Sequence, residues 1–168
     1  MRVLFAGGMS QRKGLADLFQ AMKLLRRGDI QLVVMGAAIA PMEFYRKQYD
    51  GFLYEAPRSR ERVLELMASC DVLALPSIVE GRALVQQEAM SRGLPLVATR
   101  NAGGEDLIEE GRTGFLVPIR APEEIAARLA RLADDRGLLE TMSEAARTKA
   151  AEYTWEAYAA GLSAALRP

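Results

Sequence analysis

The 168-residue chain contains no histidine. Its absence excludes histidine acid–base catalysis, Ser-His-Asp and Cys-His nucleophile systems, and histidine metal sites. The one cysteine, Cys70, cannot form a disulfide within the chain and lies beside an apolar run. We expect it to pack as a small hydrophobic residue in a cytosolic protein.

The chain also lacks an excess of charge of either sign. Its 22 lysines and arginines balance 22 aspartates and glutamates. No overall basic field therefore attracts nucleic acid or an anionic membrane, and any anion site must be local. No stretch approaches the roughly 18 apolar residues of a transmembrane helix, and glycine follows the first apolar residues too soon for a signal peptide. These absences predict a cytoplasmic location and no transmembrane segment.

What the sequence does contain is typical of one soluble domain, since 50% of its residues are hydrophobic and 26% are charged. Short apolar runs alternate with amphipathic segments, which predicts an α/β fold: a Rossmann-like doubly wound parallel sheet in a single three-layer α/β/α domain. The expected strands are residues 2–6, 30–35, 52–54, 71–75, 96–99 and 115–118. The expected helices are residues 14–27, 41–48, 58–69, 82–92, 101–110, 122–133, 137–152 and 154–167, the last packing back across the domain with Trp155 and Tyr158.

Ligands bind such sheets at the carboxyl ends of the strands, so the turns there are the first candidates for a site. In the turn after the first strand, Gly7 and Gly8 permit close approach of a ligand, and Lys13 precedes a helix. A cation beside helix amides suits phosphate. The spacing matches neither common phosphate-binding glycine motif, and taken alone it favours an ordinary turn.

The turn after the fourth strand carries two carboxylates, Glu80 and Glu88. On a continuous helix rising about 1.5 Å per residue they would lie roughly 12 Å apart, which is about the reach from a diphosphate-linked sugar to a ribose. Glu88 falls among apolar residues, where an unpaired carboxylate is costly to bury. Equally consistent with the sequence are a glutamate at a helix start and a second glutamate paired with an arginine.

A third turn contains the pair Gly103 and Gly104, which could approach the same ligand or simply connect strand and helix tightly. The chain contains no D-x-D motif, and we expect no metal and no separate cofactor.

Taken in order, these turns resemble the nucleotide-sugar-binding C-terminal domain of retaining family 4 (group 1) glycosyltransferases, which have the two-domain GT-B architecture. The resemblance spans nearly the whole chain. It rests on Gly7 with Lys13 and Gly14, on a Leu-Pro-Ser leading into Glu80 and Glu88 as the family's E-x7-E pair, and on later glycine turns at 103–104 and 114–118.

The resemblance implies specific roles. Lys13 would neutralise the donor diphosphate, Glu80 would face the donor sugar, and Glu88 would bind the ribose hydroxyls. The amides of Gly81, Arg82, Ala83 and Leu84 would hold the phosphates and sugar. The Gly36 turn and residues 54–56 would contact the base, largely through backbone.

This sequence departs from the family at two positions. Gly8 stands where the family commonly has an arginine at the diphosphate, so either Arg12 or Arg82 would have to replace that cation. Ala83 stands where the family often has glycine, which reduces backbone freedom.

The leading hypothesis is therefore the donor-binding half of a hexosyltransferase that uses a nucleotide diphosphate sugar. No room precedes the first strand for the family's N-terminal acceptor domain, so we expect that domain to be absent and the isolated chain to bind nucleotide with little or no turnover. The full-length enzyme would be cytoplasmic or membrane-peripheral. The alternative is a non-catalytic Rossmann-like regulatory or protein-interaction module.

Overall fold

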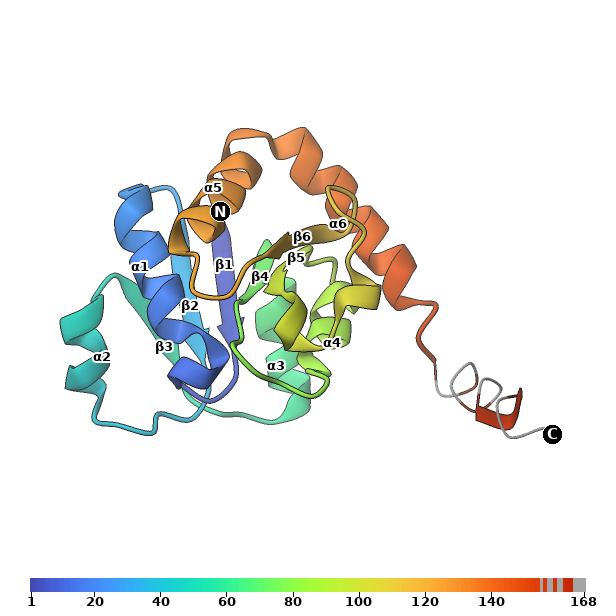
Figure 1. The fold of residues 1–168 in the computed structure, drawn as a ribbon, viewed down its shortest axis with the longest axis horizontal. Coiled ribbons are helices and arrows are strands. Elements are labelled where there is room, and N and C mark those ends of the chain that lie inside the picture. The colour runs from blue at the N-terminus through green and yellow to red at the C-terminus, as the bar shows by residue number, and fades with distance from the viewer. Residues whose placement is uncertain (155, 157–158, 160–161, 165–168) are drawn as a thin grey trace.

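The computed structural model describes residues 1–154, 156, 159 and 162–164. Within them the chain forms a parallel sheet of six strands in the order β3-β2-β1-β4-β5-β6 (Figure 1). The strands are β1 (Arg2–Ala6), β2 (Gln31–Met35), β3 (Phe52–Glu55), β4 (Val72–Leu75), β5 (Leu96–Thr99) and β6 (Gly114–Val117). This confirms the predicted doubly wound α/β fold. The switch in strand order falls between β1 and β4.

Helices cover both faces of the sheet. Helix α1 packs against α5 on one face, while α4 packs against α6 and α3 on the other. Their bounds are α1 (Leu15–Leu25), α2 (Met42–Gln48), α3 (Arg60–Ala68), α4 (Val85–Ser91), α5 (Pro122–Asp134) and α6 (Arg136–Ala150). Among the described residues, no helix is long and apolar enough to cross a membrane.

The sheet is apolar on both faces, and the strands are therefore near-continuous apolar runs. Val3, Leu4 and Phe5 of β1 are fully buried, as is every residue of β4 and β5 apart from a trace of exposure at Thr99. Cys70 is also buried, as expected, and its burial raises the pKa of the thiol. This rigid sheet fixes where the strand-end loops begin.

Two expected helices differ from the structure. The segment predicted as 101–110 forms two short 3₁₀ turns, Arg100–Ala102 and Glu105–Leu107, separated by the glycine pair. The segment predicted as 82–92 becomes helical only at Val85. The final helix expected over 154–167, with Trp155 and Tyr158, falls largely outside the described residues.

Candidate functional site

The loop after β1 is shaped by its glycines. Gly14 has φ +75°, and a Cβ there would lie 1.9 Å from the Pro76 carbonyl oxygen. Only glycine therefore lets this loop touch the loop after β4. Within the loop after β1, a 3₁₀ turn (Gln11–Lys13) carries the two basic residues of the loop, Arg12 and Lys13. The Lys13 side chain lies beside Gly7, since a Cβ on Gly7 would meet its Cε at 3.5 Å.

Hydrogen bonds to backbone carbonyl oxygens join the loops after β1, β4 and β5. The Ile78 amide donates to the Arg12 carbonyl oxygen at 2.8 Å, and the Asn101 side-chain amide donates to the Ile78 carbonyl oxygen at 2.9 Å. The three loops consequently meet at the carboxyl ends of the central strands. This is the edge at which an open parallel sheet binds ligands.

Two cations meet one carboxylate at this edge. The Lys13 ammonium contacts Oε2 of Glu80, and Nη1 of Arg12 lies 3.4 Å from Oε1 of Glu80. The side chains of Lys13 and Glu80 are only 13% and 14% exposed, whereas that of Arg12 is 56% exposed. The structure thus brings together three of the residues that the sequence placed in the site.

Glu88, on α4, forms a separate ion pair. Its Oε1 accepts a hydrogen bond from Nε of Arg60 at 3.0 Å, and its side chain is 27% exposed. Glu88 is therefore partly exposed and paired, so no unpaired carboxylate is buried among the apolar residues around it in the sequence. Both glutamates are paired with cations. For Glu88 this is the arginine pairing that the alternative interpretation of the sequence predicted.

The predicted geometry between the two glutamates also needs correction. Because α4 begins at Val85, Glu80 lies in the preceding loop, and the helical rise cannot be used to separate it from Glu88. Gly81, Arg82, Ala83 and Leu84 are likewise not first-turn helical residues. The Ala83 amide donates to the Ala102 carbonyl oxygen at 3.3 Å, so it is already engaged within the protein.

The glycine pair after β5 explains this irregular segment. A Cβ on Gly103 would lie 1.7 Å from the Gly81 carbonyl oxygen, and one on Gly104 would lie 2.5 Å from the Gln86 side-chain amide. These glycines therefore let the loops after β4 and β5 pack directly on each other. Of the two roles predicted for the turn at Gly103 and Gly104, this packing corresponds to the tight connection after the strand.

Arg82 points to a different cluster from Glu80. Its guanidinium donates to both carboxylate oxygens of Asp106, at 3.1 and 3.0 Å, and the Tyr153 hydroxyl donates to the same carboxylate. Burial alone would raise the pKa of Asp106, but the hydrogen bonds from Arg82 and Tyr153 outweigh it and lower that pKa. Arg82 is thus committed to an ion pair that the sequence did not predict.

The predicted base-contacting turns lie next to one another. A Cβ on Gly36 would lie 1.9 Å from the Gly7 carbonyl oxygen, and the Tyr54 hydroxyl donates to the Gly36 carbonyl oxygen at 3.1 Å. Gly36 therefore brings the loop after β2 against the loop after β1. Gly8, by contrast, has nothing within 4 Å of where its Cβ would be.

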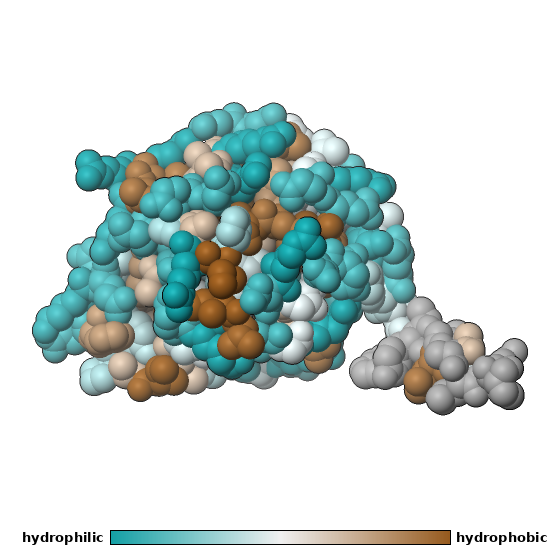
Figure 2. Space-filling view, in the orientation of Figure 1, coloured by the Kyte–Doolittle hydropathy of each residue, from teal (hydrophilic) through white to brown (hydrophobic). Residues whose placement is uncertain are grey.

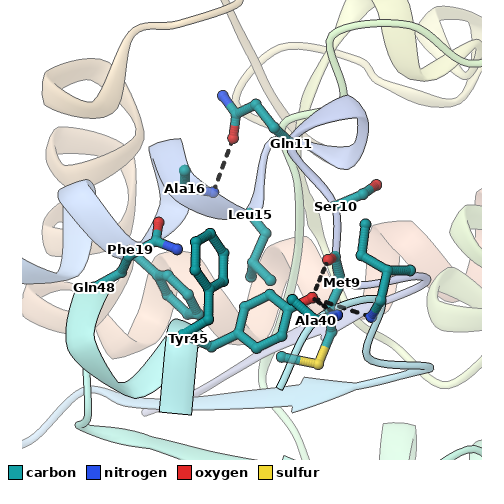
Figure 3. Close-up of a pocket in the computed structure, with 11 residues that line it drawn as sticks. Met9, Ser10, Gln11, Leu15, Ala16, Phe19, Ala40, Tyr45 and Gln48 are labelled. Carbon is teal, nitrogen blue, oxygen red and sulfur yellow. Dashed lines mark hydrogen bonds between the residues drawn. The ribbon is translucent and has the colours of Figure 1, made fainter. Parts of the chain in front are cut away.

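A separate apolar pocket of about 280 Å³ opens between α1, α2 and the loops after β1 and β2 (Figure 3). The Tyr45 hydroxyl at its wall donates to the Met9 carbonyl oxygen and accepts from the amides of Ile39 and Ala40. Ile39 and Phe44 remain exposed beside it. The pocket contains neither Lys13 nor either glutamate, and its lining offers no charged group to a phosphate.

Apolar residues are also exposed on the loop between β4 and α4, where Val79 and Leu84 flank Glu80 in the sequence. Figure 2 shows that, on the face viewed, hydrophobic side chains gather into a patch bordered by hydrophilic ones. Two exposed apolar side chains, those of Val79 and Leu84, therefore lie on the same loop as Glu80.

Sequence reasoning missed Arg60 and Asp106 as neighbours of predicted site residues. Arg60 lies 28 residues from Glu88, and Asp106 lies 24 residues from Arg82. A run of arginines at 58, 60 and 62 was the one visible signal for the first pair. The second pair depends on how the loop after β5 packs, for which the sequence has no local signal.

The fold and this edge define a Rossmann-like α/β domain with a cation–carboxylate cluster at its topological switch point. The family described as "Glycosyl transferases group 1" matches residues 1–135. The chain belongs to this family, which confirms the resemblance.

Individual relatives are consistent with this assignment. A D-inositol 3-phosphate glycosyltransferase of Paenarthrobacter aurescens is 30% identical over 169 residues, which cover 94% of this chain and 41% of the relative. A sulfoquinovosyl transferase of Arabidopsis thaliana is 32% identical over 160 residues, covering 92% and 31%. The chain therefore spans less than half the length of these relatives.

Solved structures share the fold. The C-terminal domain of a glycosyl transferase group 1 family protein from Francisella tularensis superposes with a TM-score of 0.80 at 19% identity, covering 89% of this chain and 84% of that one. Anabaena HepE, solved in complex with UDP-glucose, superposes with a TM-score of 0.80 at 24% identity, covering 90% and 44%.

Proposed function

We propose that this chain is the donor-binding half of a retaining glycosyltransferase that moves a hexose from a nucleotide diphosphate sugar to a glycan or lipid-linked glycan acceptor. The observation that carries the proposal is the convergence of Lys13 and Glu80 at the switch point between β1 and β4. Family membership and the names of the relatives support it.

Lys13 would stabilise the negative charge that develops on the departing diphosphate. The glycine-shaped loop directs the Lys13 side chain past Gly7, so the ammonium lies at the switch point where that charge would develop. Glu80 would face the donor sugar, and Glu88 would accept the ribose hydroxyls after Arg60 moves aside. Catalysis would then depend on positioning and on charge stabilisation, without a protein nucleophile.

The acceptor would be held by an N-terminal domain of the GT-B type. On this proposal, the described domain alone binds nucleotide and turns over little. Gly36 and Tyr54 would lie next to the base, where backbone groups make most of the contacts.

The second candidate is a non-catalytic Rossmann-like module that has lost effective donor binding. The open space at Gly8 favours it, because no side chain contributes a phosphate cation from that position. Titration of the purified chain with UDP, GDP and ADP, followed by calorimetry, distinguishes the two functions. Saturable binding of at least one nucleoside diphosphate is expected for the donor site. If none of the three nucleotides binds, the donor-site proposal is contradicted and the non-catalytic module is the remaining function.

A further inference from the structure

The charge balance of the Lys13 cluster is unusual, because two cations share a single carboxylate. Lys13 holds Oε2 of Glu80 in a mostly buried contact, and Arg12 reaches Oε1 from the exposed side at 3.4 Å. The same Arg12 nitrogen lies 3.5 Å from the Val79 carbonyl oxygen. The three side chains together carry one net positive charge, and Arg12 is held only by long contacts.

The other arginine near this loop is not available to an anion here. Arg82 makes two hydrogen bonds to Asp106 at 3.0 and 3.1 Å, and its guanidinium lies 5.6 Å from the centre of the Tyr153 ring. Moving it would leave the Asp106 carboxylate without its bidentate partner. Among the described residues of the β1 and β4 loops, the cations within reach of a diphosphate are the two that hold Glu80.

We infer that Glu80 acts as a tethered anion that competes with the diphosphate for Lys13 and Arg12. In the empty site Glu80 is the counter-ion of both cations; a diphosphate takes its place, and Arg12 becomes the second phosphate cation in place of the absent side chain at Gly8. The inference rests on the proposed function. On this inference, Glu80 turns toward the sugar only after a diphosphate has replaced it as the partner of Lys13 and Arg12.

The electrostatic consequence is opposite to that of an ordinary binding residue. Neutralising Glu80 raises the net charge of the cluster from one to two positive charges, which strengthens its attraction for an anion at short range. Nucleotide ligands without a sugar should therefore bind more tightly when Glu80 is neutral. A ligand whose sugar depends on Glu80 should gain less.

The test is calorimetric titration of wild type and Glu80→Gln with inorganic pyrophosphate and with the tightest-binding nucleoside diphosphate. We expect Glu80→Gln to bind both about three- to tenfold more tightly, as for the loss of one competing charged hydrogen bond. Glu43→Gln is the matched control, since Glu43 is an exposed glutamate on α2 that is paired with Lys47 outside the site, and its affinity for either ligand should not rise.

A second arm concerns the arginines. Arg12→Ala should weaken pyrophosphate binding and remove most of the gain in the Glu80→Gln background, whereas Arg82→Ala should leave that gain in place. Arg12 is exposed, so its substitution tests the proposal even if a Glu80 variant fails to fold.

Equal or weaker pyrophosphate binding by folded Glu80→Gln, or undiminished binding by Arg12→Ala, would overturn the inference. If nucleoside diphosphates bind wild type and only these variant results fail, the competition is wrong while the donor site stands. If no nucleoside diphosphate binds wild type, the proposed function fails first. A gain in pyrophosphate binding by Glu80→Gln would still support the competition in that case.

Discussion

The two glutamates of the site, Glu80 and Glu88, lie in contrasting surroundings. Glu80 and its partner Lys13 are 14% and 13% exposed, between loops that are joined by backbone hydrogen bonds. Glu88 is 27% exposed, and its partner Arg60 is 78% exposed. The first pair is built into the domain, whereas the second is an ion pair largely open to solvent. The loops of the phosphate end are thus fixed by their packing, and only the Glu80 side chain would have to move for a diphosphate, whereas both side chains of the ribose end can rearrange around a ligand.

The contrast has its origin in the loops. At the phosphate end, Gly14 packs under Pro76, and the Ile78 amide donates to the Arg12 carbonyl oxygen. At the ribose end, Glu88 and Arg60 are carried by separate helices, and a long, exposed arginine side chain makes the contact. Exposed ion pairs of this kind contribute little to stability, because water and salt screen them.

Disrupting the packing at the phosphate end should have the largest effect. Gly14→Ala introduces a Cβ that would lie 1.9 Å from the Pro76 carbonyl oxygen, at a φ of +75°. We expect it to lower the free energy of unfolding by about 4 kcal/mol, as for combined backbone strain and overpacking. Urea denaturation measures this. Gly8→Ala is the matched control, since its Cβ meets nothing within 4 Å; equal losses in the two variants would contradict the packing argument.

The next largest effect should come from Lys13→Ala. Loss of the ammonium should weaken nucleoside diphosphate binding by about 3 kcal/mol, the upper range for a charged hydrogen bond. Nucleoside binding should change far less, because the nucleoside carries no phosphate. Calorimetry with the matched pair of ligands checks the difference. Lys47→Ala removes an exposed lysine paired with Glu43 on α2 and should change neither affinity; an equal loss for nucleoside and diphosphate in Lys13→Ala would refute the assignment.

The sequence predicted the sheet well, because each buried parallel strand is a short apolar run with a glycine or proline near its end. Lys13 and Glu80 were chosen as site residues for a related reason. They follow β1 and β4, which are the two neighbouring strands between which the strand order reverses. Ligands bind open parallel sheets at the carboxyl ends of such strands. Their local positions made them candidates, and the resemblance to the glycosyltransferase family then assigned them to one site, because each turn taken alone was explained at least as well without a ligand.

Other features depend on contacts that are distant in the sequence. Helix α4 starts three residues later than its predicted start at residue 82, because the segment before it packs on Gly103 and the Ala83 amide bonds to Ala102. Local periodicity contains no trace of those contacts. The sequence likewise contains no signal for the pairing of Arg82 with Asp106. Without that signal, Arg12 and Arg82 were equal candidates for the second phosphate cation.

At the ribose end, Glu88→Ala should weaken nucleoside and nucleoside diphosphate binding alike. We expect a loss of about 1 to 3 kcal/mol, the value for a charged acceptor of hydroxyl hydrogen bonds, and less than the diphosphate-specific loss in Lys13→Ala. Comparison of ribose with 2′- and 3′-deoxyribose nucleotides checks the role, since the variant should no longer distinguish them. Glu43→Ala, an exposed glutamate on α2, is the control. Unchanged affinity in Glu88→Ala would exclude the ribose contact.

The smallest effect should follow Arg60→Ala. Because Arg60 is 78% exposed, its loss should change the free energy of unfolding by less than about 0.5 kcal/mol. It should also leave nucleotide affinity unchanged or raise it by no more than about threefold, since Glu88 no longer has to exchange an arginine for ribose. Any gain should shrink with added salt, because salt already screens the pair in wild type.

The matched control for Arg60 is Arg62→Ala, which removes a second exposed arginine from α3. Titrations of both variants at low and high ionic strength separate an effect of the Glu88 pair from a general change in surface charge. A large loss of affinity in Arg60→Ala alone would show that Arg60 contacts the ligand directly. The ribose end would then be as specifically built as the phosphate end, and the contrast between the two glutamates would no longer hold.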